Sequence, residues 1–229
     1  VPTEGKVFVL GMDSAEGNNT LSIRSHAGMV FQNPDNQMVT SIVEEDIAFG
    51  PENLGVPPEE IRQRVDRALE AVNMSRYATF TPHNLSGGPK QRIAIAGVLA
   101  MQPDIVVLDE STAMLDPQGR REILRIVQEL NRQMGMTIIL ITHMMEEAAL
   151  ADRVVVVSEG SVAMDGKPEE ILQQADQLYA LGLEPPFAVR IAMDLRRMLG
   201  WRDLPLSNDL DLLADSIAAA SASPGRGGE

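Results

Sequence analysis

Short apolar stretches that alternate with amphipathic helical segments are the feature that most limits how this chain can fold. Residues 104–110 (DIVVLDE) and 136–143 (MTIILITH) have the length of strands and are apolar almost throughout, and a segment with helical periodicity, 117–134, lies between them. Uniformly apolar strands that alternate with helices are typical of a parallel sheet. We therefore predict an α/β fold with a parallel sheet covered on both faces.

The rest of the chain continues this pattern up to a helical C-terminal part. A helix is indicated wherever apolar residues recur every three or four positions, and a hairpin where two alternating runs flank Glu159-Gly160. The further predicted elements are strands at 6–10 and 27–31, helices at 57–72 and from about Lys90 to Met101, a hairpin at 153–166, and two or three helices from Pro168 to about Ala220.

Polar side chains stand at the carboxyl ends of three predicted strands. Gln32 follows the strand at 27–31, Asp109 and Glu110 end the next one, and His143 ends the last. Ligands bind at the carboxyl ends of parallel strands, so we expect these four residues to form one site. An Asp-Glu pair can place one carboxylate on Mg²⁺ and the other on a water that attacks phosphorus. Taken singly, each residue also fits a plain role as a solvated strand end or a turn cap.

The stretch LSGGPKQR, residues 85–92, places a serine and two glycines where a helix begins. Free backbone N–H groups and the helix dipole favour an anion there, most often a phosphate. Ser86 is also a good N-cap residue, so an ordinary helix start is the alternative. Because Gly87 and Gly88 are poor choices for helix stability alone, we favour a phosphate site.

Composition excludes some classes of function and favours others. A net charge of −14 argues against a nucleic-acid partner, which needs a basic face. The absence of cysteine favours an intracellular protein. No apolar run approaches the roughly 18–20 residues of a membrane span. The small-residue, Gly-rich stretch at 219–229 is interpreted as a disordered tail.

The order of these motifs resembles the ATPase cassette of ABC transporters. Gln32, LSGG, VVLDE, MLD and His143 are similar to that family's Q-loop, signature, Walker B, D-loop and H-loop, over residues 5 to about 170. The stretches VFQNPDNQ, IAIAGVLAMQPDIVVLDE and LITHMMEEA further resemble the energy-coupling-factor (ECF) branch, and within it the first of two paired ATPase subunits. The resemblance implies a P-loop NTPase-like ABC ATPase fold. It divides the chain into a partial ATPase domain at 1–170, with a helical subdomain at about 40–100, a C-terminal helical extension at 171–218 and the tail.

The resemblance also implies roles for the candidate residues. In that family two cassettes face each other head to tail, so Ser86, Gly87 and Gly88 would grip an ATP held by the partner, and Asp116 would cross the same interface. The remaining residues would serve this chain's own nucleotide. Glu110 would be the general base, His143 would stabilise the γ-phosphate and water, Asp109 would support Mg²⁺, and Gln32 would sense the metal and couple to the membrane partner.

One motif of the family is missing from this sequence. No G-x-x-x-x-G-K-[ST] stretch, the P-loop or Walker A, occurs in residues 1–229. Two explanations compete: a fragment of a longer protein, which Val at position 1 favours, or a degenerate subunit that contributes only a signature face. In either case we expect the chain alone not to hydrolyse ATP at a useful rate. We also expect poor stability, because strands 104–109 and 136–142 would lose backbone partners. Pro89 replaces the family's usual Gln, which a first helical turn tolerates.

The partners that the resemblance implies are a second ABC ATPase subunit, a transmembrane coupling (T) subunit and a substrate-capture (S) subunit. The location would be the cytoplasmic face of a prokaryotic cell membrane. The acidic stretch Glu44-Glu45-Asp46 is either a solvated helix start or a socket for arginines of the T subunit. Cobalt, nickel and vitamins all remain open as substrates. The alternative functions are a non-catalytic regulatory cassette and a soluble ABC-type ATPase.

Overall fold

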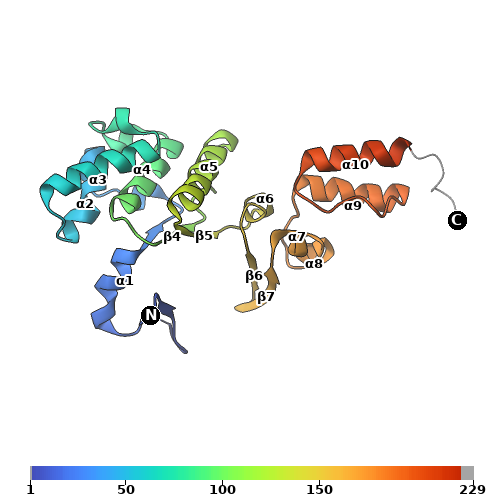
Figure 1. Ribbon diagram of the computed structural model, residues 1–229, viewed down its shortest axis with the longest axis horizontal. Coiled ribbons are helices and arrows are strands. Elements are labelled where there is room, and N and C mark those ends of the chain that lie inside the picture. Colours follow the sequence, from blue (N-terminus) through green and yellow to red (C-terminus); the bar gives the residue numbers. More distant parts are fainter. Residues whose placement is uncertain (1, 223–229) are drawn as a thin grey trace. The chain divides into compact units, whose positions relative to one another are not determined.

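The computed structural model describes residues 2–222, which form two compact units, the first ending at Ile141 and the second beginning at Thr142 (Figure 1). The first unit contains a three-stranded sheet and five helices, and the second contains a hairpin and five helices in its described part. None of the helices in residues 2–222 is long and apolar enough to cross a membrane. Each unit has its own buried apolar core.

The sheet of the first unit is parallel, as the sequence predicts. Its strands are β3 (Ala27–Val30), β4 (Ile105–Asp109) and β5 (Thr137–Ile141), in the order β3-β4-β5. In this register Val30 lies beside Leu108, and Leu108 beside Leu140. Strand β4 therefore has a partner on each side, contrary to the expectation that it would lose one. Within residues 2–222, β5 pairs with β4 alone.

The two faces of this sheet are covered unequally. The covered face carries Gly28, Val30, Val106 and Leu108, which are buried, and Ile138 and Leu140, which pack against the same core. On the opposite face Met29, Ile139 and Ile141 are 38%, 47% and 45% exposed. The prediction of a sheet covered on both faces is therefore wrong for the described residues. An apolar run predicts a strand, but it does not supply the helices that would cover each side.

Helices of the first unit build its core. They are α2 (Val43–Asn53), α3 (Pro58–Ala71), α4 (Gly87–Ala100) and α5 (Pro117–Met134). The predicted helices at 57–72 and 117–134 are confirmed, and α3 buries Val65, Ala68 and Leu69, as its periodicity requires. Helix α4 starts at Gly87, three residues earlier than predicted. Its middle is buried on most sides, because it packs against α2, α3 and β3.

The N-terminal segment differs from its prediction. The strand expected at 6–10 is reduced to β1 (Phe8–Val9), which pairs antiparallel with β2 (Met12–Asp13) inside the predicted polar loop. Leu10 and Gly11 both have positive φ, at 50° and 80°, which turns the chain back at that point. A 3₁₀ turn at Gly17–Asn19 and helix α1 (Thr20–His26) then lead into β3.

The second unit begins with helix α6 (Met145–Ala148) and the predicted hairpin. Strands β6 (Val154–Ser158) and β7 (Ser161–Gly166) pair antiparallel, and Glu159 and Gly160 form the turn with φ of 48° and 76°. Val154, Val156 and Met164 of the hairpin pack in the core of this unit. The hairpin therefore groups with the C-terminal helices in the compact unit that starts at Thr142, and the domain boundary expected at residue 170 stays a prediction.

Four helices follow the hairpin, where two or three were predicted. They are α7 (Pro168–Leu172), α8 (Ala175–Ala180), α9 (Phe187–Leu199) and α10 (Leu210–Ala222). Helices α9 and α10 run side by side (Figure 1). Because α10 continues to Ala222, the tail predicted from residue 219 starts at least four residues too early; residues 223–229 of that prediction lie outside the described part.

Candidate functional site

The carboxyl ends of β3 and β4 bring two predicted site residues together. Gln32 is the second residue after β3, and Glu110 directly follows β4. The Gln32 side-chain amide donates a hydrogen bond from Nε2 to Glu110 Oε2 at 3.0 Å. These residues are 78 positions apart in the sequence, so the parallel register of the two strands creates the contact. The sequence predicts this juxtaposition, and the roles of the two residues remain predictions.

Glu110 has a backbone conformation that the sequence does not predict. Its φ is +46°, a region that residues with a side chain rarely adopt. The Glu110 N–H donates to the Ile141 carbonyl at 3.0 Å, which fixes the turn against the end of β5. Neither Gly nor Asn stands at this position to signal a left-handed residue. Backbone strain of this kind is common at functional sites, where it holds a side chain in one direction.

Asp109 is the last residue of β4 and is half-buried at the same edge. In residues 2–222 no group of three or more His, Cys, Asp and Glu side chains is placed to hold a metal ion. The carboxylate of Asp109 can therefore supply at most part of a magnesium site. His143 is the second residue of the other compact unit, where it is exposed.

The start of α4 is the place where the sequence predicts a phosphate site. Ser86 is the N-cap with extended backbone, and its side chain makes no capping hydrogen bond. Ser86 thus occupies the N-cap position without capping the helix through its side chain, and its hydroxyl is left for another partner. Gly87 and Gly88 follow as the first two helical residues, and Pro89 causes no break, because Lys90 N–H bonds regularly to the Ser86 carbonyl at 3.1 Å.

Two helix N-termini lie beside each other at this point. A Cβ placed on Gly88 would stand 4.0 Å from Gly119 Cα, and one on Gly119 would stand 3.9 Å from Gly88 Cα. Asp116 is the N-cap of α5 and accepts from the Gly119 N–H at 2.6 Å. The carboxylate of Asp116 thus caps the second helix. Both helix dipoles favour negative charge in this region.

A charged pair fixes the loop beside Gln32. Lys90 of α4 donates from Nζ to Asp35 Oδ1 at 2.7 Å, and His83 Nδ1 lies 3.8 Å from the same oxygen. The hydrogen bond from Lys90 holds the pKa of the Asp35 carboxyl below its ordinary value. The loop is thereby tied to the first turns of α4.

Most carboxylates of the acidic stretch at the start of α2 already have partners within the first unit. Asp46 Oδ1 accepts from the backbone N–H groups of Val39 and Thr40 at 2.7 and 3.0 Å, and Glu44 pairs with Arg62 at 2.8 Å. Glu45 is exposed and has no ion pair in residues 2–222. An arginine socket at this place would therefore depend on Glu45 first.

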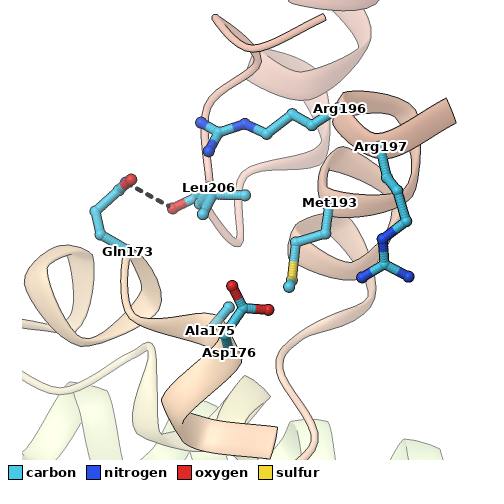
Figure 2. Close-up of a pocket in the computed structure, with 7 residues that line it drawn as sticks. All are labelled: Gln173, Ala175, Asp176, Met193, Arg196, Arg197 and Leu206. Atoms are coloured by element: carbon cyan, nitrogen blue, oxygen red, sulfur yellow. Dashed lines mark hydrogen bonds between the residues drawn. The ribbon is translucent and has the colours of Figure 1, made fainter. Parts of the chain in front are cut away.

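A hollow of about 310 Å³ lies in the second unit and contains none of the predicted site residues. Its lining includes Asp176 of α8 and Met193, Arg196 and Arg197 of α9 (Figure 2). Arg196 donates from Nε to the Leu204 carbonyl at 2.9 Å, so part of its guanidinium is already hydrogen-bonded. The hollow mixes both signs of charge, and no role follows from it.

Comparisons with known proteins agree with this arrangement. The sequence pattern of the family described as "ABC transporter" matches residues 1–113. The "Energy-coupling factor transporter ATP-binding protein EcfA1" of Caldanaerobacter subterraneus is 55% identical over 197 residues, which are 86% of this chain and 71% of that protein. The protein of the same name from Symbiobacterium thermophilum is 59% identical and covers 86% of this chain and 68% of its own length. The chain belongs to the ABC transporter ATPases.

Solved structures support the same family and its ECF branch. The structure of cbiO1 from Clostridium perfringens, described as part of the ABC transporter complex cbiONQ, has a TM-score of 0.70 and 37% identity, over 80% of this chain and 73% of that one. A dimeric ABC cassette described as bound to ADP and Pi has a TM-score of 0.64 and 29% identity, over 73% of this chain and 75% of that one. The predicted ABC ATPase fold and the similarity to the ECF ATP-binding subunits are confirmed.

Proposed function

We propose that this chain is the energy-coupling ATPase subunit of an ECF-type importer for vitamins or transition-metal ions and works as one half of a cassette pair. Its relatives are ECF ATP-binding subunits, and one of them belongs to a cbiONQ complex. The observation that carries the proposal in this chain is the start of α4, where the Ser86 hydroxyl makes no capping bond and the next two residues, Gly87 and Gly88, carry no side chain. That surface suits a phosphate that another subunit holds.

The residues at the sheet edge would serve the chain's own nucleotide, whose triphosphate supplies the phosphoryl group that water attacks. Glu110 would orient that water or take its proton, and Gln32, bonded to Glu110, would hold this carboxylate in place until metal and nucleotide compete for it. Asp109 would contribute one ligand to Mg²⁺, and His143 would approach the γ-phosphate. Asp116 would reach the partner from the N-cap of α5.

The membrane partners follow from the same proposal. A T subunit would dock at the loop and helix after Gln32, with Glu45 as the carboxylate left for an arginine. An S subunit would supply the substrate, so the choice between cobalt, nickel and vitamins would be made outside this chain. The subunit would act at the cytoplasmic face of a prokaryotic membrane.

The test is complementation of a second cassette. The partner carries an intact P-loop and an arginine in place of its own signature serine, so that ATP on its P-loop can be gripped only by the signature of the 229-residue chain. We expect turnover in the mixture and none from either protein alone. Ser86→Arg should abolish the turnover, whereas Ser22→Arg, at an exposed position of α1, should leave it intact.

Failure of the mixture would contradict the proposal if both proteins are folded and form a complex. It would favour the alternative, a non-catalytic regulatory cassette. Charge reversal at Glu45 that leaves assembly with the T subunit intact would rule out the socket separately.

A further inference from the structure

Phe31, the residue directly before Gln32, has both of its backbone polar groups bonded to side-chain amides. The Phe31 N–H donates to Gln37 Oε1 at 2.8 Å, and the Phe31 carbonyl accepts from Gln91 Nε2 at 3.1 Å. Gln37 Nε2 also donates to the Met29 carbonyl at 3.2 Å. One amide side chain comes from the loop itself and the other from α4. We name these contacts of Gln37 and Gln91 with Phe31 the Phe31 clamp.

Gln91 is an unusual residue for its position. Its side chain is 0% exposed in a helix whose next residues include the buried Ile93 and Ile95, and its Oε1 has no hydrogen-bond partner in the described part of the chain. A buried acceptor without a partner lowers stability, and an apolar side chain of the same size would avoid that cost. The Gln91 amide therefore gives the Phe31 carbonyl a donor and leaves its own oxygen without a partner.

The neighbouring residue of α4 makes a second tie to the same loop. Lys90 bonds to Asp35 at 2.7 Å, and its side chain is only 14% exposed. Residues 90 and 91 therefore hold the loop on both sides of Gln32, at Asp35 and at Phe31. Ser86 lies five residues earlier on the same helix, less than one and a half turns away. A displacement of the loop at Phe31 or Asp35 is thus passed directly to the start of α4.

We propose that Gln91 and Gln37 are positioning residues, which lock Gln32 and the signature start at Ser86 into one moving unit. The proposal rests on the proposed function, because it connects the loop that would face the membrane partner with the helix start that would grip a partner's ATP. When the loop shifts, the helix start shifts with it, and the affinity of the pair for ATP changes.

The first experiment uses the full chain alone and measures amide hydrogen exchange in residues 31–37. Gln91→Leu and Gln37→Leu each remove one bond of the clamp, and exchange of this segment should accelerate roughly fivefold, as expected for the loss of one net hydrogen bond. Gln63→Leu makes the same chemical change at an exposed position of α3 and should leave the segment unchanged. Thermal unfolding separates the roles: Gln91→Leu should lower Tm by no more than the loss of one net hydrogen bond explains, whereas a larger drop would mean that the residue is kept for folding.

The second experiment measures ATP turnover of the chain mixed with the signature-deficient partner cassette. Gln91→Leu should raise the KM for ATP several-fold, whereas a loss of folded protein would lower only the maximal rate. The double variant Gln37→Leu/Gln91→Leu should be no worse than the stronger single variant, because both residues act on one unit.

The outcomes separate the two proposals. Unchanged exchange at 31–37 in Gln91→Leu overturns the clamp, whatever the turnover does. Accelerated exchange with an unchanged KM shows that the clamp exists but does not position the signature, and this also overturns the proposal. If the unsubstituted chain gives no turnover with the partner, the proposed function fails, while the exchange experiment still decides whether the loop is clamped.

Discussion

The covered and exposed faces of the β3-β4-β5 sheet have the same kind of sequence and different surroundings. Val30 and Leu108 on one face are 0% exposed, whereas Ile139 and Ile141 on the other are 47% and 45% exposed. Adjacent residues of one strand also differ, because Met29 of β3 is 38% exposed and Val30 is 0% exposed. The stability of this unit should accordingly depend on one face of the sheet, although most residues of both faces are apolar.

The largest expected effect is at the centre of the covered face. Leu108→Ala removes a fully buried side chain between Val30 and Leu140 and should lower the free energy of unfolding by about 2–5 kcal/mol. Ile139→Ala, on the exposed face of the neighbouring strand, should cost under about 1.5 kcal/mol. Urea unfolding of both variants, followed by circular dichroism, gives the two values. Equal losses would mean that the two faces are covered alike in solution.

The second effect tests how closely helix α4 lies on the covered face. A Cβ on Gly28 would stand 2.3 Å from Val98 Cγ1, so one of them must move. Gly28→Ala should therefore destabilise the chain by about 1–3 kcal/mol. The double variant Gly28→Ala/Val98→Ala should recover part of that loss. Met29→Ala, at the next residue on the exposed face, is the matched control and should cost less. The measurement is again the urea midpoint, and no recovery in the double variant would contradict the close approach.

The third effect concerns association through the exposed face. Contiguous exposed apolar side chains promote contacts between molecules, and β5 has a free edge within residues 2–222. Ile139→Lys should reduce aggregation, with a change in unfolding free energy within about 1 kcal/mol. Light scattering during storage at fixed concentration measures the first quantity. Val107→Lys in the central strand serves as a comparison on the same face. Unchanged scattering in both variants would show that the exposed face does not drive association.

The sequence predicts most elements of this fold for identifiable reasons. The apolar strands at 104–110 and 136–143, the amphipathic helices at 57–72 and 117–134 and the hairpin turn at Glu159-Gly160 each carry a local signal, and all are found. The covering of each sheet face has no local signal, because it depends on which helices are available to pack there. The strand predicted at 6–10 is shorter than expected, because the positive φ values of Leu10 and Gly11 turn the chain back after Val9.

The candidate site also combines one contact that the sequence predicts with features that it does not predict. The contact of Gln32 with Glu110 follows from parallel topology, because the ends of neighbouring strands meet at one edge. The φ of +46° at Glu110 and the buried amide of Gln91 have no counterpart in local sequence pattern. Gln91 stands inside LSGGPKQR, yet residue type alone does not reveal that it faces the Phe31 carbonyl. Contacts of this kind arise from packing between distant segments.

The smallest expected effect concerns an exposed ion pair, which extends the comparison of buried and exposed positions from apolar side chains to charged ones. Arg153 donates from Nε and Nη2 to the two carboxylate oxygens of Asp165 at 2.7 and 2.6 Å, in an exposed part of the β6–β7 hairpin. The hydrogen bond from Arg153 lowers the pKa of Asp165 from its ordinary value of 3.8. A carboxyl with a depressed folded-state pKa contributes stability above pH 3.8, and this contribution is lost as the pH falls through the lower folded-state value.

Asp165→Asn should therefore be slightly less stable than the unsubstituted chain at pH 6, and the difference should disappear at acidic pH. Solvent screening keeps this contribution small, and added salt should reduce it further. The measurement is the urea midpoint of both proteins between pH 6 and pH 2.5, at low and high salt. The loss in Leu108→Ala has no ionisable cause and should not change over the same range. A pH-independent difference for Asp165→Asn would mean that the side chain stabilises the hairpin by packing, as the buried positions do, and not by charge.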